Sequence, residues 1–161
     1  MLRVSDVFER ALHAPAAACT EPGEVVVIRS ADSYDGKQGM SLATGVSNRS
    51  AGAQALCLHL ITIPPGTRGV PHTHDGHESA IYTVSGETEV WHGEGLRQRT
   101  VVKAGDFMYV PPGTPHLPVN RSDVTTVAVV ARTDPQEQES VVTMNLPPHL
   151  AELNAFPVAS Q

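Results

Sequence analysis

From residue 54 onward, short apolar and β-branched runs alternate with breaks that are rich in glycine and proline. Runs of this length, with no helical period between them, predict β-strands joined by tight turns. The expected strands cover residues 55–63, 80–84, 87–92, 98–103, 107–110, 124–132 and 141–146. Several short strands at such regular spacing predict an all-β domain, folded as an antiparallel sandwich or a small barrel.

Two of these runs, 55–63 and, within 124–132, residues 124–130, are apolar at nearly every position instead of alternating with polar residues. Strands of that kind are covered on both faces. We therefore expect both to be central strands or part of a contact between subunits.

The segment before the barrel carries weaker patterns. Ser5 is placed to cap a short helix over 6–13, and the β-branched run within 24–30 predicts one more strand. The polar stretch 32–52 predicts a loop with a short strand near 42–46. The resulting organisation is an N-terminal extension over 1–54 that packs on the barrel, a barrel over 55–146 and a C-terminal tail over 147–161, whose ends we expect to be frayed.

The composition limits the class of protein. With 161 residues and 40% hydrophobic content, the chain can bury one core. Eleven basic against seventeen acidic residues, a net charge of -6 and no basic run argue against nucleic acid and anionic membrane surfaces as partners. No apolar run approaches the ~18 residues of a membrane span, and the two cysteines suit neither a disulfide framework nor a thiolate zinc site. We therefore expect a cytoplasmic protein whose partner is a small molecule.

Three histidines and one carboxylate are candidate metal ligands: His72, His74, Glu78 and His116. Imidazole nitrogens and carboxylate oxygens bind divalent first-row transition metals. Residues two apart in a strand face the same way, so His72 and His74 can reach one ion. The Pro-Pro-Gly turn at 111–113 comes shortly before His116, and such turns can return that residue beside the first pair in a β scaffold. The pattern predicts one metal ion per chain.

These two clusters resemble the paired motifs of the cupin superfamily. The second one fits the family pattern at each defined position, with Gly105, Pro111, Gly113, His116 and Asn120. The resemblance covers residues 55–132 and includes one pair of motifs, so the chain is similar to single-domain cupins, and in detail to an uncharacterised branch of small bacterial ones. It implies a double-stranded β-helix, or jelly-roll, barrel of two antiparallel sheets, a single metal ion inside it, and a homodimer.

The first motif departs from the family pattern at the acidic ligand. In the family this glutamate lies seven residues before the closing glycine, a position that Ser79 occupies here, whereas Glu78 lies eight residues before Gly86. Strand alternation places His77 on one face and Glu78 on the other, so a four-histidine site that uses His77 is the alternative to a His3Glu site. A β-bulge would restore Glu78. We favour Glu78 because it keeps the family's spacing from His74.

The ligand set implies chemistry on a small molecule. A His3Glu site on Fe2+ leaves positions for a chelating substrate and for dioxygen, so we expect a dioxygenase-type non-haem oxygenase, with Mn2+, Zn2+ and Ni2+ as the other candidate ions. The alternatives are metal-assisted isomerase, cyclase or lyase chemistry, and a binding protein with a structural metal. Candidates for the cavity wall are His59, Tyr82, Met108 and Tyr109, with Arg68 at its mouth; for each, simple packing or exposure is the alternative.

Overall fold

The computed structural model describes residues 25–29, 33–136, 138 and 140–159, and the helix expected over 6–13 lies outside them. The strands are β1 (Ser33–Asp35), β2 (Ser41–Val46), β3 (Cys57–Ile63), β4 (Thr67–Arg68), β5 (His72–His74), β6 (Ser79–Ser85), β7 (Glu87–His92), β8 (Gln98–Lys103), β9 (Phe107–Val110), β10 (His116–Asn120), β11 (Thr126–Arg132) and β12 (Val141–Thr143). The helical segments are α2 (Asn48–Ala51) and the 3-10 helices η1 (Glu94–Leu96) and η2 (Pro148–Ala155). The expected all-β class is confirmed.

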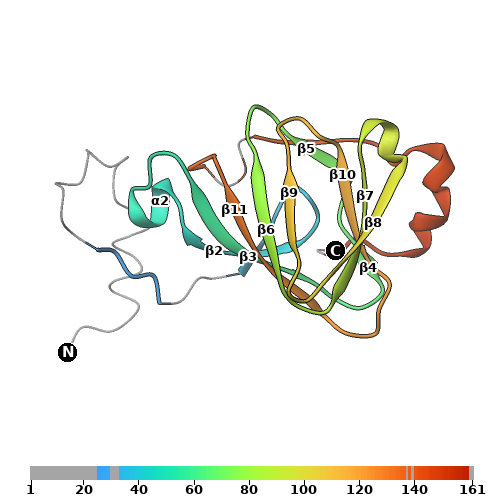
Figure 1. Cartoon of the computed structure of the whole chain (residues 1–161), viewed down its shortest axis with the longest axis horizontal. Coiled ribbons are helices and arrows are strands. Elements are labelled where there is room, and N and C mark those ends of the chain that lie inside the picture. The colour runs from blue at the N-terminus through green and yellow to red at the C-terminus, as the bar shows by residue number, and fades with distance from the viewer. Residues whose placement is uncertain (1–24, 30–32, 137, 139, 160–161) are drawn as a thin grey trace.

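Two antiparallel sheets pack against each other around a common interior (Figure 1). The first has the strand order β1-β2-β3-β11-β6-β9, and the second has the order β12-β5-β10-β7-β8, with β4 also paired to β10. Strands far apart in the chain are neighbours in both sheets. This topology places His116 opposite His72 across the β10–β5 ladder, as the paired motifs require.

Most of the expected strands are confirmed. Three of them, 87–92, 98–103 and 107–110, coincide with β7, β8 and β9. β3 and β11 each begin two residues later than expected, at Cys57 and Thr126. β12 ends at Thr143, three residues early, because its partner β5 is itself only three residues long. The pattern of turn residues therefore located the strands well and their ends less well.

The strand expected over 24–30 is not formed by its described residues. Residues 25–29 have no regular structure, and Val25 is 90% exposed. The β-branched run has the composition of a strand, but no described strand pairs with it, and an isolated strand has no ladder hydrogen bonds to stabilise it. The expectation was wrong for these residues because strand propensity depends on a neighbouring strand.

The segment 32–52 contains more structure than its polar composition indicates. β2 confirms the short strand expected near 42–46, and it joins β3 in the first sheet. The one-turn helix α2 follows, capped by Ser47, whose side chain accepts a hydrogen bond from Ser50 N while the Ser50 side chain accepts one from Ser47 N. Gly52, with φ of 68°, ends the helix. The serines and the glycine that indicate a loop are also the residues that cap helices.

The space between the sheets holds the core. Inward side chains alternate along β3 and β11, and one buried cluster consists of Met40, Leu42, Ile61, Ile63, Ala128 and Val130. β3 and β11 lie in the middle of their sheet, as expected. On the outward side, Leu58 and Leu60 of β3 are exposed in the single chain, and the outward residues of β11 are half-buried. Both faces of these strands were expected to be covered, and the chain itself fully covers only the inner face.

The C-terminal segment packs against the outside of the second sheet, so the expectation of a frayed end is wrong for residues 148–155. Leu150 and Leu153 of η2 are buried with Leu96, Leu117 and Val119. Arg68, considered above as a residue of the cavity mouth, donates instead from Nε to the carbonyl oxygen of Leu153, 3.0 Å away. None of the helices in the described ranges is long and apolar enough to cross a membrane.

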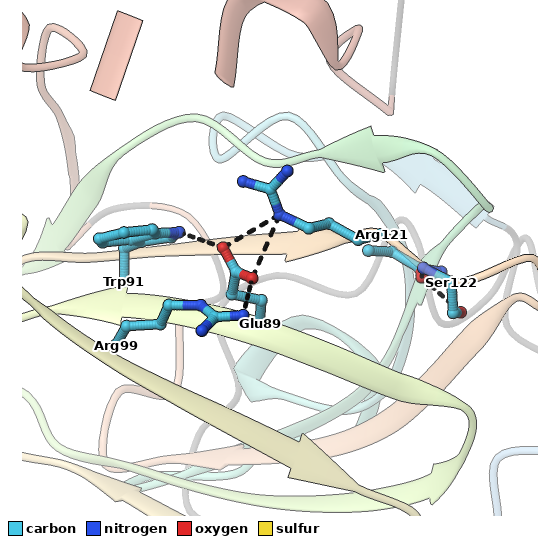
Figure 2. A network of polar contacts seen from close by, with 6 residues as sticks. Glu89, Trp91, Arg99, Arg121 and Ser122 are labelled. Carbon is cyan, nitrogen blue, oxygen red and sulfur yellow. Dashed lines mark hydrogen bonds and ion pairs between the residues drawn. The ribbon is translucent and has the colours of Figure 1, made fainter. Parts of the chain in front are cut away.

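A buried carboxylate organises the same outer face of the second sheet (Figure 2). Glu89 on β7 is 5% exposed and accepts hydrogen bonds from Trp91 Nε1, Arg99 Nη2 and Arg121 Nε. Burial alone would raise the pKa of Glu89, but these donors outweigh it and hold the pKa below its usual value. Arg121 also lies over the ring of Phe156, 4.6 Å from its centroid. The carboxylate thus connects the sheet to the C-terminal segment.

Replacing Glu89 with alanine is expected to lower the free energy of unfolding by about 2 kcal/mol or more, because two guanidinium groups and an indole N–H lose their shared acceptor. Urea denaturation measures the change. The matched control is Glu87→Ala on the same strand, whose ion pair with Lys103 spans 3.6 Å and is exposed; it should cost no more than about 0.5 kcal/mol. Equal losses in the two variants would contradict this account.

Candidate metal centre

Three of the predicted ligands lie together inside the barrel. His72 and His74 come from β5, and His116 comes from the start of β10. β5 alternates, so both of its histidines are buried while Thr73 between them is half-buried. One nitrogen from each of the three rings lies within 4.8 Å of the others, and among the described residues this is the one His, Cys, Asp or Glu cluster with such geometry. The sheet topology therefore assembles a candidate metal centre.

Backbone carbonyls orient two of the three rings. His72 Nδ1 lies 2.7 Å from the carbonyl oxygen of Val70, and His116 Nδ1 lies 2.9 Å from that of Thr114. A carbonyl oxygen only accepts, so each Nδ1 carries the proton and donates it. The lone pair of each neutral ring is then on Nε2, and this tautomer is the one that metal-binding histidines commonly use.

The third ring, His74, has a different neighbour. Its Nε2 lies 3.3 Å from Nη2 of Arg132. Arginine only donates, so Nε2 accepts and the ring proton resides on Nδ1. That Nδ1 is buried and has no hydrogen-bond partner among the described residues. A buried ring with one unsatisfied nitrogen, in the same cluster as His72 and His116, is consistent with a ligand that exchanges its present partner for an ion.

Burial keeps the three imidazoles neutral. It is the main cause that lowers the pKa of His72, His74 and His116. The positive charge of Arg132 lowers all three further. Neutral imidazole is the form that binds a metal ion. The donor set, the fixed tautomers and the burial therefore fit a divalent transition metal.

The structure does not bring Glu78 to this cluster. Its side chain is exposed, and Oε2 accepts a hydrogen bond from the hydroxyl of Tyr109, 2.7 Å away. His77, the alternative ligand, is also elsewhere: its Nδ1 lies 2.7 Å from the carbonyl oxygen of Thr133. β6 begins at Ser79 without the bulge that would turn Glu78 inward, and the buried Ser79 holds the inward position. Of the four ligands in the expected His3Glu set, the structure therefore gathers the three histidines and leaves Glu78 outside the cluster.

A charged residue that sequence reasoning missed lies beside the histidines. Arg132, the last residue of β11, is 3% exposed, and its Nε lies 3.4 Å from Ser79 Oγ. Its signal was in the sequence: Thr126, Ala128 and Val130 face inward, and the period of two places Arg132 on the same face. An arginine at an inward strand position is rare enough to indicate a functional site.

The cluster lines an internal cavity with about 650 Å³ of empty space, including its opening to solvent. Most of its wall is aliphatic, with side chains such as Ile61, Val90 and Val130. His59 and Met108, two of the expected cavity residues, line it as well. The other two, Tyr82 and Tyr109, are exposed on the outer face of the first sheet. Concave, mostly apolar sites with a few convergent polar groups are where small molecules commonly bind.

The stability of the metal-free protein is expected to fall as the pH falls below about 6.5. Burial, with a smaller contribution from Arg132, lowers the pKa of His59 to about 3. Between these two pH values the unfolded chain binds a proton at this residue and the folded chain does not. The free energy of unfolding then decreases by about 1.4 kcal/mol per pH unit for such a group as the pH is lowered.

Urea denaturation at pH 7, 6 and 5 in the presence of a chelator measures this slope. His59→Gln serves as the control, because it removes one titrating group and should make the slope shallower by the amount assigned to His59. Identical slopes for the two proteins would show that His59 does not contribute.

Comparisons with known proteins agree with this geometry. The family model of the Cupin domain matches residues 59–132. The polyketide cyclase RemF from Streptomyces resistomycificus superposes with a TM-score of 0.63 at 18% identity, covering 84% of this chain and 99% of that one. A Cupin 2 conserved barrel domain protein from Salinispora arenicola gives 0.56 at 19% identity, covering 71% and 91%. At these identities the similarity is one of fold.

A larger protein contains the same fold as one of its parts. Oxalate decarboxylase from Lactobacillus farciminis superposes with a TM-score of 0.61 at 18% identity, and the match covers 71% of this chain. The chain spans only about one third of that enzyme, since the match covers 33% of it. Among curated proteins no significant match to the chain is found.

Proposed function

Because the chain is a small single-domain member of the cupin superfamily, we propose that it is an enzyme that holds one divalent transition-metal ion through His72, His74 and His116. The proposal rests on the tautomers and the burial of the three histidine rings. Hydrogen bonds to backbone carbonyls hold His72 and His116 in the tautomer whose lone pair is on Nε2. All three rings are buried at an internal cavity. We propose that the native ion is one of Fe2+, Mn2+, Zn2+ and Ni2+.

The number of ligands supports catalysis over a structural role for the ion. Structural zinc sites are closed by four protein ligands, whereas catalytic sites keep three and leave a position open. Three histidines gather here, and Glu78 is turned away on the outer surface. A non-catalytic binding protein with a structural metal therefore fits the described site less well than an enzyme.

The chemistry favoured by this ligand set is metal-assisted isomerisation, cyclisation or elimination. A divalent ion polarises a carbonyl oxygen and stabilises the negative charge that develops there. Three neutral ligands leave the charge of the ion uncompensated, which strengthens this effect. The chain supplies the rest: aliphatic side chains from both sheets exclude water, and the imidazoles are held in one orientation by Val70 and Thr114.

Oxygenation on Fe2+ is the second candidate, and one observation favours it. Three protein ligands leave more open positions on a six-coordinate ion than the four expected from the sequence, enough for a chelating substrate and dioxygen together. The carboxylate ligand that the oxygenase interpretation relied on is absent from the cluster, which is why we place this candidate second.

The test is elemental analysis of anaerobically purified protein, followed by a substrate screen in an oxygen electrode. One ion per chain with conversion of enolisable small molecules and no oxygen uptake is the expected result. Substrate-dependent oxygen uptake by the iron-loaded protein would transfer the assignment to the oxygenase class. Failure of metal-free protein to take up any of the four ions would overturn the proposal.

We also propose that the protein is a homodimer and that the outer face of the first sheet forms the contact. This face carries the exposed apolar side chains Leu58, Leu60, Tyr82, Val84 and Phe107. Phe107 is 84% exposed, and its ring centroid lies 4.7 Å from that of Tyr82. Contiguous exposed apolar patches commonly mark protein contacts. A second copy would supply the covering that the apolar strands β3 and β11 lack in the single chain.

Phe107→Asp is expected to convert the dimer to a monomer, because it replaces the most exposed aromatic side chain of the apolar face with a charge. Size-exclusion chromatography with light scattering measures the mass. Val142→Asp, on the second sheet and half exposed, is the matched control and should remain dimeric. A monomeric wild type, or equal dissociation of both variants, would contradict the proposed contact.

The cytoplasm is the proposed location. The two cysteines of the chain, Cys19 and Cys57, are too few for a disulfide framework, and this composition fits a reducing compartment. Fractionation of cells that express the tagged full chain tests the location.

A further inference from the structure

We infer that Arg132 binds a carboxylate group of the molecule that enters the cavity, beside the ion held by the three histidines. This inference rests on the proposed function and deepens it, because it names the chemical class of the substrate. Arg132 lines the cavity and is 3% exposed, so its guanidinium acts within the interior. A carboxylate matches the planar fork of donors that a guanidinium presents.

The guanidinium of Arg132 lies beside the histidine cluster. Nη2 lies 3.3 Å from His74 Nε2, and Nε lies 3.4 Å from Ser79 Oγ. The Ser79 hydroxyl and the His74 ring thus hold the head group beside the proposed ligands. A small molecule with a carboxylate near its reactive carbonyl can meet the ion and Arg132 at the same time.

Metal binding by His74 is incompatible with its present hydrogen bond to Arg132. A neutral imidazole has one ring lone pair to offer, and arginine can only donate. If Nε2 binds the ion, its lone pair is used; if Nδ1 binds the ion, the ring proton moves to Nε2, which then cannot accept. In either case Nη2 of Arg132 loses the acceptor 3.3 Å away. Loading the site therefore makes a donor available to an incoming ligand.

The charges in the cavity favour an anion as that ligand. A divalent ion and the guanidinium would place three positive charges close together, whereas the described residues that line the cavity include no Asp or Glu. Asp134 and Cys57 act on Arg132 from outside this lining. In a mostly aliphatic interior, three positive charges close together are costly. A bound carboxylate reduces this cost, and a neutral molecule of the same shape does not.

The experiment titrates Zn2+ into metal-free protein and then acetate into the zinc-loaded protein, both by calorimetry. Arg132→Gln is expected to bind Zn2+ at least as tightly as the wild type, since it frees the His74 lone pair and removes a positive charge. Its affinity for acetate should fall at least about tenfold, as loss of a charge-assisted hydrogen bond requires. A merely structural role for Arg132 would lower the affinity for Zn2+ as well.

Acetamide, which is neutral and similar in shape, is the ligand control, and the wild type should prefer acetate over it more strongly than Arg132→Gln does. Unchanged acetate affinity in Arg132→Gln, or an equal preference in both proteins, would overturn the inference. If Arg132→Gln does not fold, Arg132→Lys decides: it keeps the charge and loses the fork, so acetate affinity should fall while Zn2+ affinity is retained, and unchanged acetate affinity again overturns the inference. A wild type that takes up no metal would instead overturn the proposed function.

Discussion

Replacing His116 with alanine is expected to reduce the metal content from about one ion per chain to a trace. Two histidines from the short strand β5 would remain, and two neutral ligands bind a divalent ion far more weakly than three. The side chain is almost fully buried, so the variant also leaves a cavity; circular dichroism checks that the barrel is retained. Elemental analysis after dialysis against a chelator-free buffer measures the content.

The matched controls for this variant are Glu78→Ala and His77→Ala. Both residues lie within six positions of His72, yet their side chains contact Tyr109 and Thr133 instead of the cluster. Both variants should therefore keep the wild-type metal content. Loss of metal in Glu78→Ala would show that the carboxylate reaches the ion after all and would restore the His3Glu set. Retention of stoichiometric metal in His116→Ala would eliminate the site itself.

Gly86→Ala is expected to lower the free energy of unfolding by about 3 kcal/mol or more, the largest effect we expect from a single methyl group in this fold. Gly86 joins β6 to β7 with φ of +77°, a region that other residues rarely adopt. A Cβ there would lie 2.8 Å from the carbonyl oxygen of Thr125 and 2.9 Å from Cα of Thr126, both backbone atoms that cannot rotate away.

Gly113→Ala separates the two causes of this effect. Gly113 has a similar φ of +70°, but no atom lies within 4 Å of the Cβ position. Gly113→Ala should therefore lower the free energy of unfolding by only about 1 kcal/mol, the conformational cost of a positive φ. Urea denaturation of both variants measures the difference. Equal losses would show that φ alone, and not contact with β11, explains the requirement for glycine at residue 86.

The scaffold was predictable from sequence where local and tertiary signals agree. β7, β8 and β9 have strand composition, flanking turn residues and a partner on at least one side, and their limits were predicted without error. Residues 25–29 have the same composition and no described partner, so the local signal alone was insufficient there. The helix η2 escaped prediction because Leu150 and Leu153 gain their stability from the second sheet, which the local sequence does not show.

The candidate site was predictable to the level of its histidines. His72, His74 and His116 occupy inward positions of strands, and strand alternation together with the motif spacing located them. Strand alternation left Glu78 and His77 as alternative ligands, and we favoured Glu78 because of its spacing from His74. In the structure, the Glu78 side chain lies outside the cluster. Alternation along β11 indicated that Arg132 faces inward, but its contact with His74, 58 positions away, is a tertiary relation that no local pattern contains.

The histidine pair of β5 depends on a segment outside both motifs. β5 is three residues long and lies between β10 and β12, with His74 opposite Val141 and His72 opposite Thr143. A strand this short has few hydrogen bonds of its own, so the edge strand β12 restrains the backbone that carries two of the three ligands. Variation at residues 141–143 can therefore tune the affinity for the ion without any side chain there approaching it, and the metal centre and the C-terminal part of the chain are parts of one cooperative unit.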